Sequence, residues 1–199
     1  MTQGPRRAGR RPGASGTREA IADAARRLFA ERGFDRTSLR AVADEAGVDQ
    51  ALVSHFYGSK QQLFVAVVEL PFDPEVVLPR LVAGDRETLG FRLAQFLVTL
   101  LESEQGRSRI TGLVRAASSE PEAARMVREL VSTRIFKPLT DALDVDDAPL
   151  RATLVGSQVI GLTMARYIVQ VEPLASADPE TVVAAIAPTL QRYLLEPLR

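Results

Sequence analysis

The chain contains no cysteine, which excludes both a disulfide framework and a thiolate metal site. It contains one histidine, His55, whereas a metal site needs several ligands and a catalytic histidine needs an orienting carboxylate and a substrate pocket. No apolar run reaches the roughly 20 residues that span a bilayer, and the N-terminus lacks the apolar core of a secretory signal. We therefore expect a cytoplasmic protein with no metal, no cofactor and no membrane partner.

Motifs of common enzyme classes are also missing. The sequence has no Gly-x-Ser-x-Gly elbow and no His-Glu-x-x-His, and the "GSK" at residues 58–60 lacks the upstream glycine of a phosphate-binding loop. An enzyme is thus the weaker of two competing hypotheses. The other hypothesis rests on the charge distribution.

Positive charge is concentrated at the N-terminal end. Residues 1–60 carry eleven Arg and Lys against seven Asp and Glu, a balance of +4, and the rest of the chain carries −4. Within residues 1–16 four arginines stand among Gly and Pro with no acidic residue, so we expect this arm to be disordered. Two interpretations remain open: a solubilising tail, or an arm that contacts nucleic-acid phosphates.

Four helices are expected after the arm. The first has apolar residues at helical spacing, with Thr17 as its cap and Gly33 at its end. The second is capped by Thr37 or Ser38 and ends at Gly47. A third, capped by Asp49, covers about residues 50–56, and Gly58 stops it.

The fourth helix opens with a predicted capping box. In it Ser59 accepts from the backbone of Gln62, and the Gln62 side chain reaches back to Ser59. Lys60 on its first turn opposes the helix dipole, a conflict that an external anion would remove.

The second and third helices, joined by an Ala-Gly-Val turn, have the spacing of a helix-turn-helix. Apolar positions are expected to hold the two helices together: Leu39, Val42, Ala46, Val48, Leu52, Val53 and Phe56. Small or polar residues remain to face outward on the third helix: Asp49, Gln50, Ala51, Ser54 and His55. A surface of this kind suits a DNA major groove, so we expect His55 to point at a phosphate or a base edge.

The stretch "TSLRAVADEAGVDQALVSHFYGSKQQLF", with "TREAIADAARRLFAERGFDRTS" before it, resembles the DNA-binding signature of the tetracycline-repressor (TetR) family of bacterial regulators. The resemblance covers Thr17 to about Val68. It implies an all-helical homodimer with a three-helix DNA-binding module at residues 17–70 and a larger effector-binding and dimerisation domain at 71–199. This chain departs from the family pattern at Ser54, where tyrosine is usual, and at Tyr57 and Gly58, where phenylalanine and often proline stand.

The resemblance implies double-stranded operator DNA as the partner. Carried over by position, Thr37 caps the second helix and contacts phosphate, His55 lies at a contact position, and Lys60 reaches phosphate. Tyr57 either replaces the missing contact or packs under the fourth helix. The full set of candidate DNA contacts is Thr37, Ser38, Arg40, Asp49, Gln50, Ala51, Ser54, His55, Tyr57 and Lys60.

Beyond "PFDP" at residues 71–74 the chain is expected to be helical near 74–83, 87–104, 107–118, 121–143, 149–171 and 179–195, with no strand pattern. The resemblance implies that the last two long helices pair with their copies in a four-helix dimer bundle. Gly156, Gly161 and Ala165 have the spacing of a close helix approach. Packing of these helices within one subunit is the alternative.

A small hydrophobic or amphipathic effector is expected among the segments from 87 to 143, with help from 149–171. Its candidate contacts are Phe91, Phe96, Leu100, Leu113, Arg115, Met126, Ile135, Phe136, Gln158 and Met164, although each apolar member also suits a plain core position. Repression is the family's usual mode. Activation, and architectural DNA binding without an effector, remain alternatives.

Overall fold

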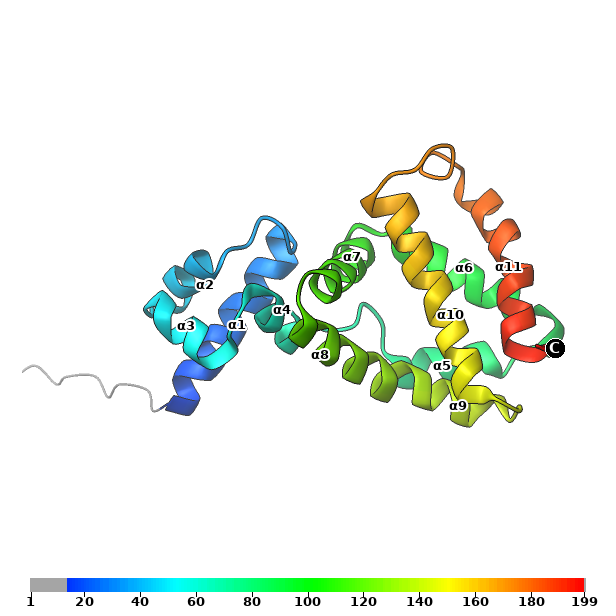
Figure 1. Ribbon diagram of the computed structural model, residues 1–199, viewed down its shortest axis with the longest axis horizontal. Coiled ribbons are helices and arrows are strands. Elements are labelled where there is room, and N and C mark those ends of the chain that lie inside the picture. Colours follow the sequence, from blue (N-terminus) through cyan, green and yellow to red (C-terminus); the bar gives the residue numbers. More distant parts are fainter. Residues whose placement is uncertain (1–13, 199) are drawn as a thin grey trace, which may run out of the picture.

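The computed structural model describes residues 14–198, which form helices and connecting turns and contain no strand (Figure 1). The all-α prediction is thus confirmed. Helices α1–α4 form an N-terminal module, and helices α5–α11 form a larger C-terminal module beside it (Figure 1). In the part of the chain that the structure describes, no helix has the length and apolar character needed to cross a membrane.

The four helices of the N-terminal module are α1 (Ala14–Arg32), α2 (Leu39–Ala46), α3 (Gln50–Tyr57) and α4 (Lys60–Val67). The first helix begins three residues before the predicted Thr17, and the basic arm predicted before it lies otherwise outside the described residues. Gly33 and Gly47 follow α1 and α2 with φ of 75° and 66°, as their predicted role as helix stops requires.

The C-terminal module follows the predicted segments closely. Its elements are α5 (Pro74–Val82), η1 (Arg86–Thr88), α6 (Leu89–Glu102), α7 (Glu104–Ser119), α8 (Pro121–Val131), η2 (Ser132–Phe136), α9 (Lys137–Leu143), α10 (Ala148–Leu162), η3 (Thr163–Ile168) and α11 (Pro179–Leu195). The π-helical segment η2 joins α8 to α9, and the π-helical η3 continues α10. Each of the predicted segments 121–143 and 149–171 is therefore largely one continuous helix that contains a π-helical stretch.

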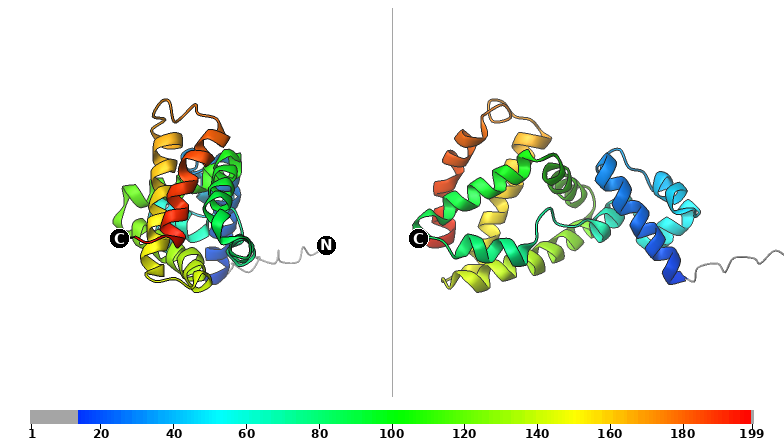
Figure 2. Two further views of the ribbon diagram at one scale, coloured as in Figure 1. Left: turned by 90° about the vertical axis from the view of Figure 1, so that its right-hand side faces the viewer. Right: turned by 180° about the vertical axis from the view of Figure 1, so that it is seen from behind.

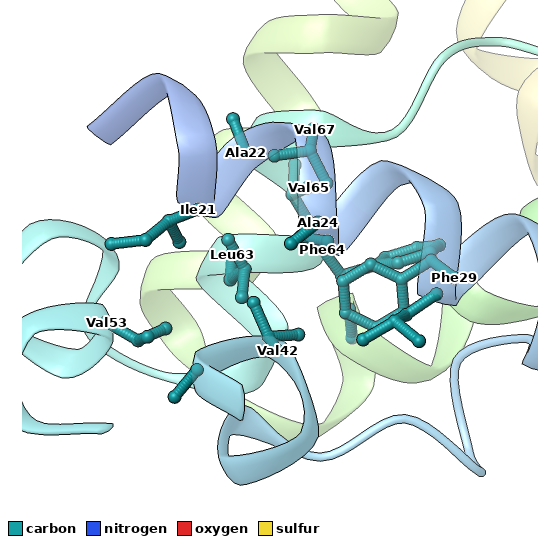
Figure 3. Close-up of a cluster of buried hydrophobic side chains, with 14 of the residues drawn as sticks. Ile21, Ala22, Ala24, Phe29, Val42, Val53, Leu63, Phe64, Val65 and Val67 are labelled. Carbon is teal, nitrogen blue, oxygen red and sulfur yellow. The ribbon is translucent and has the colours of Figure 1, made fainter. Parts of the chain in front are cut away.

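The core of the N-terminal module is not closed by its own four helices. Ile21, Val42, Val53 and Leu63 are fully buried among α1–α4 (Figure 3). The same hydrophobic cluster also contains residues of α7 and α8, namely Leu113, Ala116, Ala123, Met126, Val127 and Leu130. Because α7 and α8 supply one wall of this cluster, the two modules share a packed interface.

The C-terminal module has a second hydrophobic cluster, in which α6 and α11 lie side by side (Figure 2). A Cβ built on Gly90 of α6 would lie 2.5 Å from the backbone nitrogen of Gln191, so only glycine permits this approach. Arg151 at the start of α10 is buried and donates to the carbonyls of Tyr193 and Glu196 at 2.9 Å. These bonds cap the end of α11 and fix it against the start of α10.

Candidate nucleic-acid interface and effector region

The helix-turn-helix is built from two capped helices. Ser38 caps α2 by accepting from the backbone of Ala41 at 3.1 Å, and Asp49 caps α3 by accepting from Ala51 at 2.7 Å. Gly47 between them adopts the left-handed conformation, and its N–H donates to the carbonyls of Ala43 and Asp44. These local bonds fix the angle at which α3 leaves the turn.

One face of α3 is presented to solvent. Gln50, Ala51, Ser54 and His55 are exposed, whereas Val53 is fully buried against the module core. Successive helical residues turn by about 100°, which places the four exposed residues on one side. The structure therefore brings together the predicted outward face. Leu52 is the exception to the predicted core, because it lies at the edge of this face and is 40% exposed.

Of the two caps that the sequence left open for α2, the structure has Ser38 and not Thr37, which the family resemblance implied. The Thr37 side chain is 2% exposed. Its hydroxyl donates inward to the carbonyls of Gly33 at 2.9 Å and Leu28 at 3.2 Å, which ties the α1–α2 turn to the end of α1. A phosphate contact by the Thr37 side chain is thus inconsistent with its burial.

Tyr57 and Lys60 both face other parts of the module. The Tyr57 hydroxyl donates to the Arg18 carbonyl at 3.0 Å, so Tyr57 packs on α1 rather than under α4. The Lys60 ammonium donates to the Asp35 carbonyl at 3.2 Å and lies 4.5 Å from the centre of the Phe34 ring. Burial in this position lowers the Lys60 pKa from its usual value, and a nearby anion would oppose that shift.

The start of α2, the first helix of the helix-turn-helix, also carries exposed polar groups. Ser38 lies at the start of α2, and Arg40 on its first turn is exposed and has no ion pair among residues 14–198. Arg40 is therefore a cation available to an external anion on the helix that precedes α3. Asp49 is exposed as well, but its carboxylate is occupied as the cap of α3.

Two family models match the chain. Residues 21–67 match the model for bacterial regulatory proteins of the tetR family, and residues 87–194 match that for a tetracyclin repressor-like C-terminal domain. The chain belongs to the TetR family. It is therefore a DNA-binding transcriptional regulator, and its family consists of regulators rather than enzymes.

Individual TetR-family proteins agree with this assignment. A regulator from Streptomyces coelicolor A3 has a solved structure that is 39% identical, with a TM-score of 0.58, and the match covers 94% of this chain and 99% of that one. The transcriptional regulator BetI of Agrobacterium fabrum (strain C58) is 28% identical over 83% of this chain and 84% of its own length. BetI of Rhizobium meliloti (strain 1021) is also 28% identical, but the match spans 57% of this chain and 56% of that protein.

The predicted effector residues of this TetR-family chain do not form one site. Phe91 is 50% exposed on α6, and Leu113 and Met126 belong to the cluster of the N-terminal module. Arg115 forms an ion pair with Asp35 in the turn between α1 and α2. These four residues therefore do not line the interior of the C-terminal module. Because α7 and α8 pack on the N-terminal module, Leu113, Arg115 and Met126 face that module instead.

The remaining six candidates stay within the C-terminal module. Phe96 packs edge-on against Phe72 with ring centres 5.1 Å apart, and Phe136 packs against Gly156 of α10. The other four are half-buried: Leu100, Ile135, Gln158 and Met164. They stay candidates for contact with an effector.

The same module also contains a buried polar cluster that the sequence motifs do not indicate. Arg166 of η3 is 6% exposed and donates to the Glu102 carboxylate at 2.9 Å, and the Tyr167 hydroxyl donates to the same oxygen at 2.9 Å. Nearby in the sequence, the Thr163 hydroxyl is fully buried with no hydrogen-bond partner among the described residues. The sequence does carry one sign of this cluster, which is a charged residue at a helical position that faces the core.

Glu102 gives this cluster a dependence on pH. Burial alone would raise the pKa of Glu102, but hydrogen bonds from Arg166 and Tyr167 outweigh it, and the pKa lies below its usual value. A carboxyl group with a lowered pKa in the folded state stabilises the protein above its unfolded pKa of about 4.3, and this contribution is lost as pH falls through the folded pKa.

We therefore expect Glu102→Gln to lower the free energy of unfolding by about 1 kcal/mol at pH 7, because it leaves Arg166 without its carboxylate. The difference from wild type should shrink as pH falls from 5 toward 3. Urea unfolding at a series of pH values measures it. Glu31→Gln, on an exposed glutamate of α1 without an ion pair in the described chain, is the matched control. A gap between Glu102→Gln and wild type that is constant with pH would contradict this account.

A second missed residue, Glu120, links the two modules. The predicted box is half right: Ser59 accepts from the Gln62 backbone at 3.1 Å, but the Gln62 side chain does not reach back. Instead its amide donates to Glu120 at the start of α8 at 2.6 Å, and the Ser59 hydroxyl donates to the other oxygen of the same carboxylate. The first turn of α4 is thus attached to the α7–α8 junction, a pairing 58 residues apart that local spacing cannot indicate.

Proposed function

We propose that this TetR-family protein is a homodimeric repressor that binds a pseudo-palindromic operator through α3 and leaves it when a small molecule binds the C-terminal module. The observation that carries the proposal is the exposed face of α3, on which Gln50, Ser54 and His55 stand beside a capped turn. A regulator of this kind acts where bacterial DNA lies, which is the cytoplasm.

Base and phosphate contacts divide between residue types. Gln50 is the candidate for a base edge, since glutamine can bond adenine bidentately in the major groove. His55, Ser54, Ser38 and Arg40 are candidates for phosphate oxygens around it. Lys60 joins them only by leaving the Asp35 carbonyl, a move that the negative potential of DNA favours.

The outer face of α10 supports the proposed dimer. Leu150 and Ile160 are 52% and 55% exposed, and a Cβ on Gly161 would meet nothing within 4 Å. The exposed positions of α10 carry no charge: Pro149, Leu150, Thr153, Ser157, Ile160 and Gly161. Gly156 does not belong to this face, because it packs against Phe136 within the subunit. An uncharged helix face with exposed aliphatic residues fits a second copy of the chain.

We expect Ile160→Asp to weaken the dimer by at least about 100-fold, because the two-fold interface would bury one unpaired charge from each subunit. Sedimentation velocity over a range of protein concentrations measures the dissociation constant. Val76→Asp places the same charge on another exposed aliphatic residue, on α5, and should leave the dimer intact. A dimer that survives Ile160→Asp would exclude this face.

The effector site is proposed among α6, η2 and α10–η3. Its candidate lining is Phe96, Leu100, Ile135, Phe136, Gln158 and Met164. The apolar majority with one amide suits a small hydrophobic or amphipathic molecule.

Coupling to DNA would pass through the contacts of α7 and α8 with the N-terminal module. Glu120 holds the first turn of α4, and Arg115 holds Asp35 in the α1–α2 turn. A ligand that moves α7 or α8 must therefore move the helix-turn-helix or break these bonds. Moving the helix-turn-helix changes the distance between the two recognition helices of a dimer. A DNA duplex can match the new distance only by deforming, which costs free energy.

Selection of bound sequences from a random double-stranded DNA library tests the proposal. We expect a pseudo-palindrome whose half-sites lie about 34–36 Å apart or at a multiple of that distance. A panel of small molecules is then screened for release of the protein from the selected site. A selected site without two-fold symmetry would contradict the dimeric reader, and a symmetric site that no molecule releases would point to DNA binding without an effector.

A further inference from the structure

A pocket lies at the junction of the two modules, apart from the effector region proposed above. It has a volume of about 260 Å³ and is lined by residues of α1, of the end of α4 and of α7. Its apolar side consists of Phe29, Phe64, Val67 and Val68. Phe29 and Phe64 are the neighbouring aromatic side chains labelled in Figure 3, with ring centres 4.9 Å apart.

Three arginines and one acidic residue also line the pocket, together with Ala30 and Ser108, so basic side chains outnumber acidic ones in its lining. Arg26 and Arg27 come from α1, Arg109 comes from α7, and Glu69 follows α4. Arg26 pairs with Asp23 and Arg27 pairs with Glu45, both at exposed positions. Exposed pairs of this kind contribute little to stability and exchange readily.

The arginines retain free donors. Among residues 14–198 the hydrogen bonds of Arg26, Arg27 and Arg109 each use one terminal nitrogen. A guanidinium has five N–H donors, so each has donors left for a planar anion. Arg109 donates hydrogen bonds to the carbonyls of Glu69 and Leu70, at 3.3 and 3.5 Å, just beyond the end of α4.

We propose that this junction pocket binds a small amphipathic carboxylate, and that its occupancy changes the position of the N-terminal module relative to the C-terminal module. The carboxylate pairs with the arginines, and an aromatic or aliphatic body lies on Phe29, Phe64 and Val67. The volume falls just below the ~300–1,000 Å³ of drug-sized sites, so the ligand is small.

Because the pocket lies between the two modules, binding of a ligand affects how the modules are placed. Its walls belong to both modules, so its shape depends on how they are placed, and a ligand that fits one placement favours that placement. A carboxylate that engages Arg109 also competes with the carbonyls beyond α4. The effect on DNA rests on the proposed function, whereas binding of the carboxylate does not.

Titration calorimetry of the full-length protein with 3-phenylpropionate tests the binding, with 3-phenylpropionamide as the uncharged counterpart. We expect the carboxylate to bind, the amide to bind at least tenfold more weakly, and Arg27→Gln to weaken the carboxylate about tenfold. Ala30→Leu, which fills the pocket from an exposed position of α1, should also weaken it. Arg125→Gln on α8 removes an equally exposed, ion-paired arginine outside the pocket and should have no effect.

Absence of carboxylate binding, or binding unchanged by both Arg27→Gln and Ala30→Leu, would overturn the site. The titration needs no DNA, so its failure is distinct from failure of the proposed function. A second titration with the selected operator tests the change of position, since linkage requires that DNA alter carboxylate affinity by the same factor as the carboxylate alters DNA affinity. A severalfold difference supports it, and equal affinities would refute it.

Discussion

Gln50→Ala is expected to lower affinity for the selected operator by on the order of 100-fold while leaving affinity for unrelated DNA nearly unchanged. A bidentate contact to a base is worth about 1–3 kcal/mol, and a dimer loses it in both half-sites. Gln50 is exposed at the start of α3 and makes no side-chain hydrogen bond within the described chain, so the change should not affect folding.

Arg40→Ala is the matched comparison. Its exposed guanidinium is a candidate phosphate contact, so its loss should weaken all sequences about equally and reduce the dependence of affinity on salt. Lys60→Ala is less informative, because it also removes the contacts with Asp35 and Phe34. Fluorescence anisotropy on operator and scrambled duplexes at several salt concentrations separates the two behaviours. If both variants weaken operator and scrambled DNA alike, the division between base and phosphate roles is wrong.

Phe64→Ala should have the largest effect on stability, about 3–5 kcal/mol. Phe64 is 2% exposed, and its ring packs edge-on against Phe29 and Phe34 at centre distances of 4.9 and 5.0 Å. The ring also packs against Gly112 of α7, where a Cβ would lie 2.7 Å from it. Loss of this ring opens a cavity at the point where the two modules meet.

Phe91→Ala, at a half-exposed phenylalanine of α6, provides the control and should cost well under half of that. Urea unfolding followed by circular dichroism gives both values. Operator binding by Phe64→Ala should fall as well, because the cavity loosens α4 against α1. Equal losses of stability in the two variants would mean that the junction contributes no more than the protein surface does.

The caps and the turn of the helix-turn-helix were predictable because they depend on neighbours within a few residues. Ser38, Gly47 and Asp49 act locally, and their spacing identified the helix-turn-helix and its exposed face correctly. Periodicity also indicates which face of a helix is buried, but it does not say against what. For this reason the sequence suggests Leu113 for an effector site, although this residue of α7 packs against the N-terminal module.

Polar pairs across the junction were beyond prediction for the same reason. Arg115 with Asp35, and Glu120 with Ser59 and Gln62, join residues far apart in sequence, and their partners depend on how the modules dock. The inward turn of Thr37 follows from a different cause. A threonine before a helix can cap that helix or can hydrogen-bond to the preceding turn. Here Ser38 caps α2, and the Thr37 hydroxyl donates to the Gly33 carbonyl instead.

The shared hydrophobic cluster of α1–α4 with α7 and α8 limits how this regulator can be re-engineered. Grafting residues 1–70 onto a foreign sensor domain would leave the apolar surface that Leu113, Ala116 and Ala123 cover without its partner. A working hybrid has to keep these three positions, together with Arg115 and Glu120, in the recipient. The transplantable unit is therefore discontinuous in the chain, consisting of the first four helices and the facing sides of two later ones.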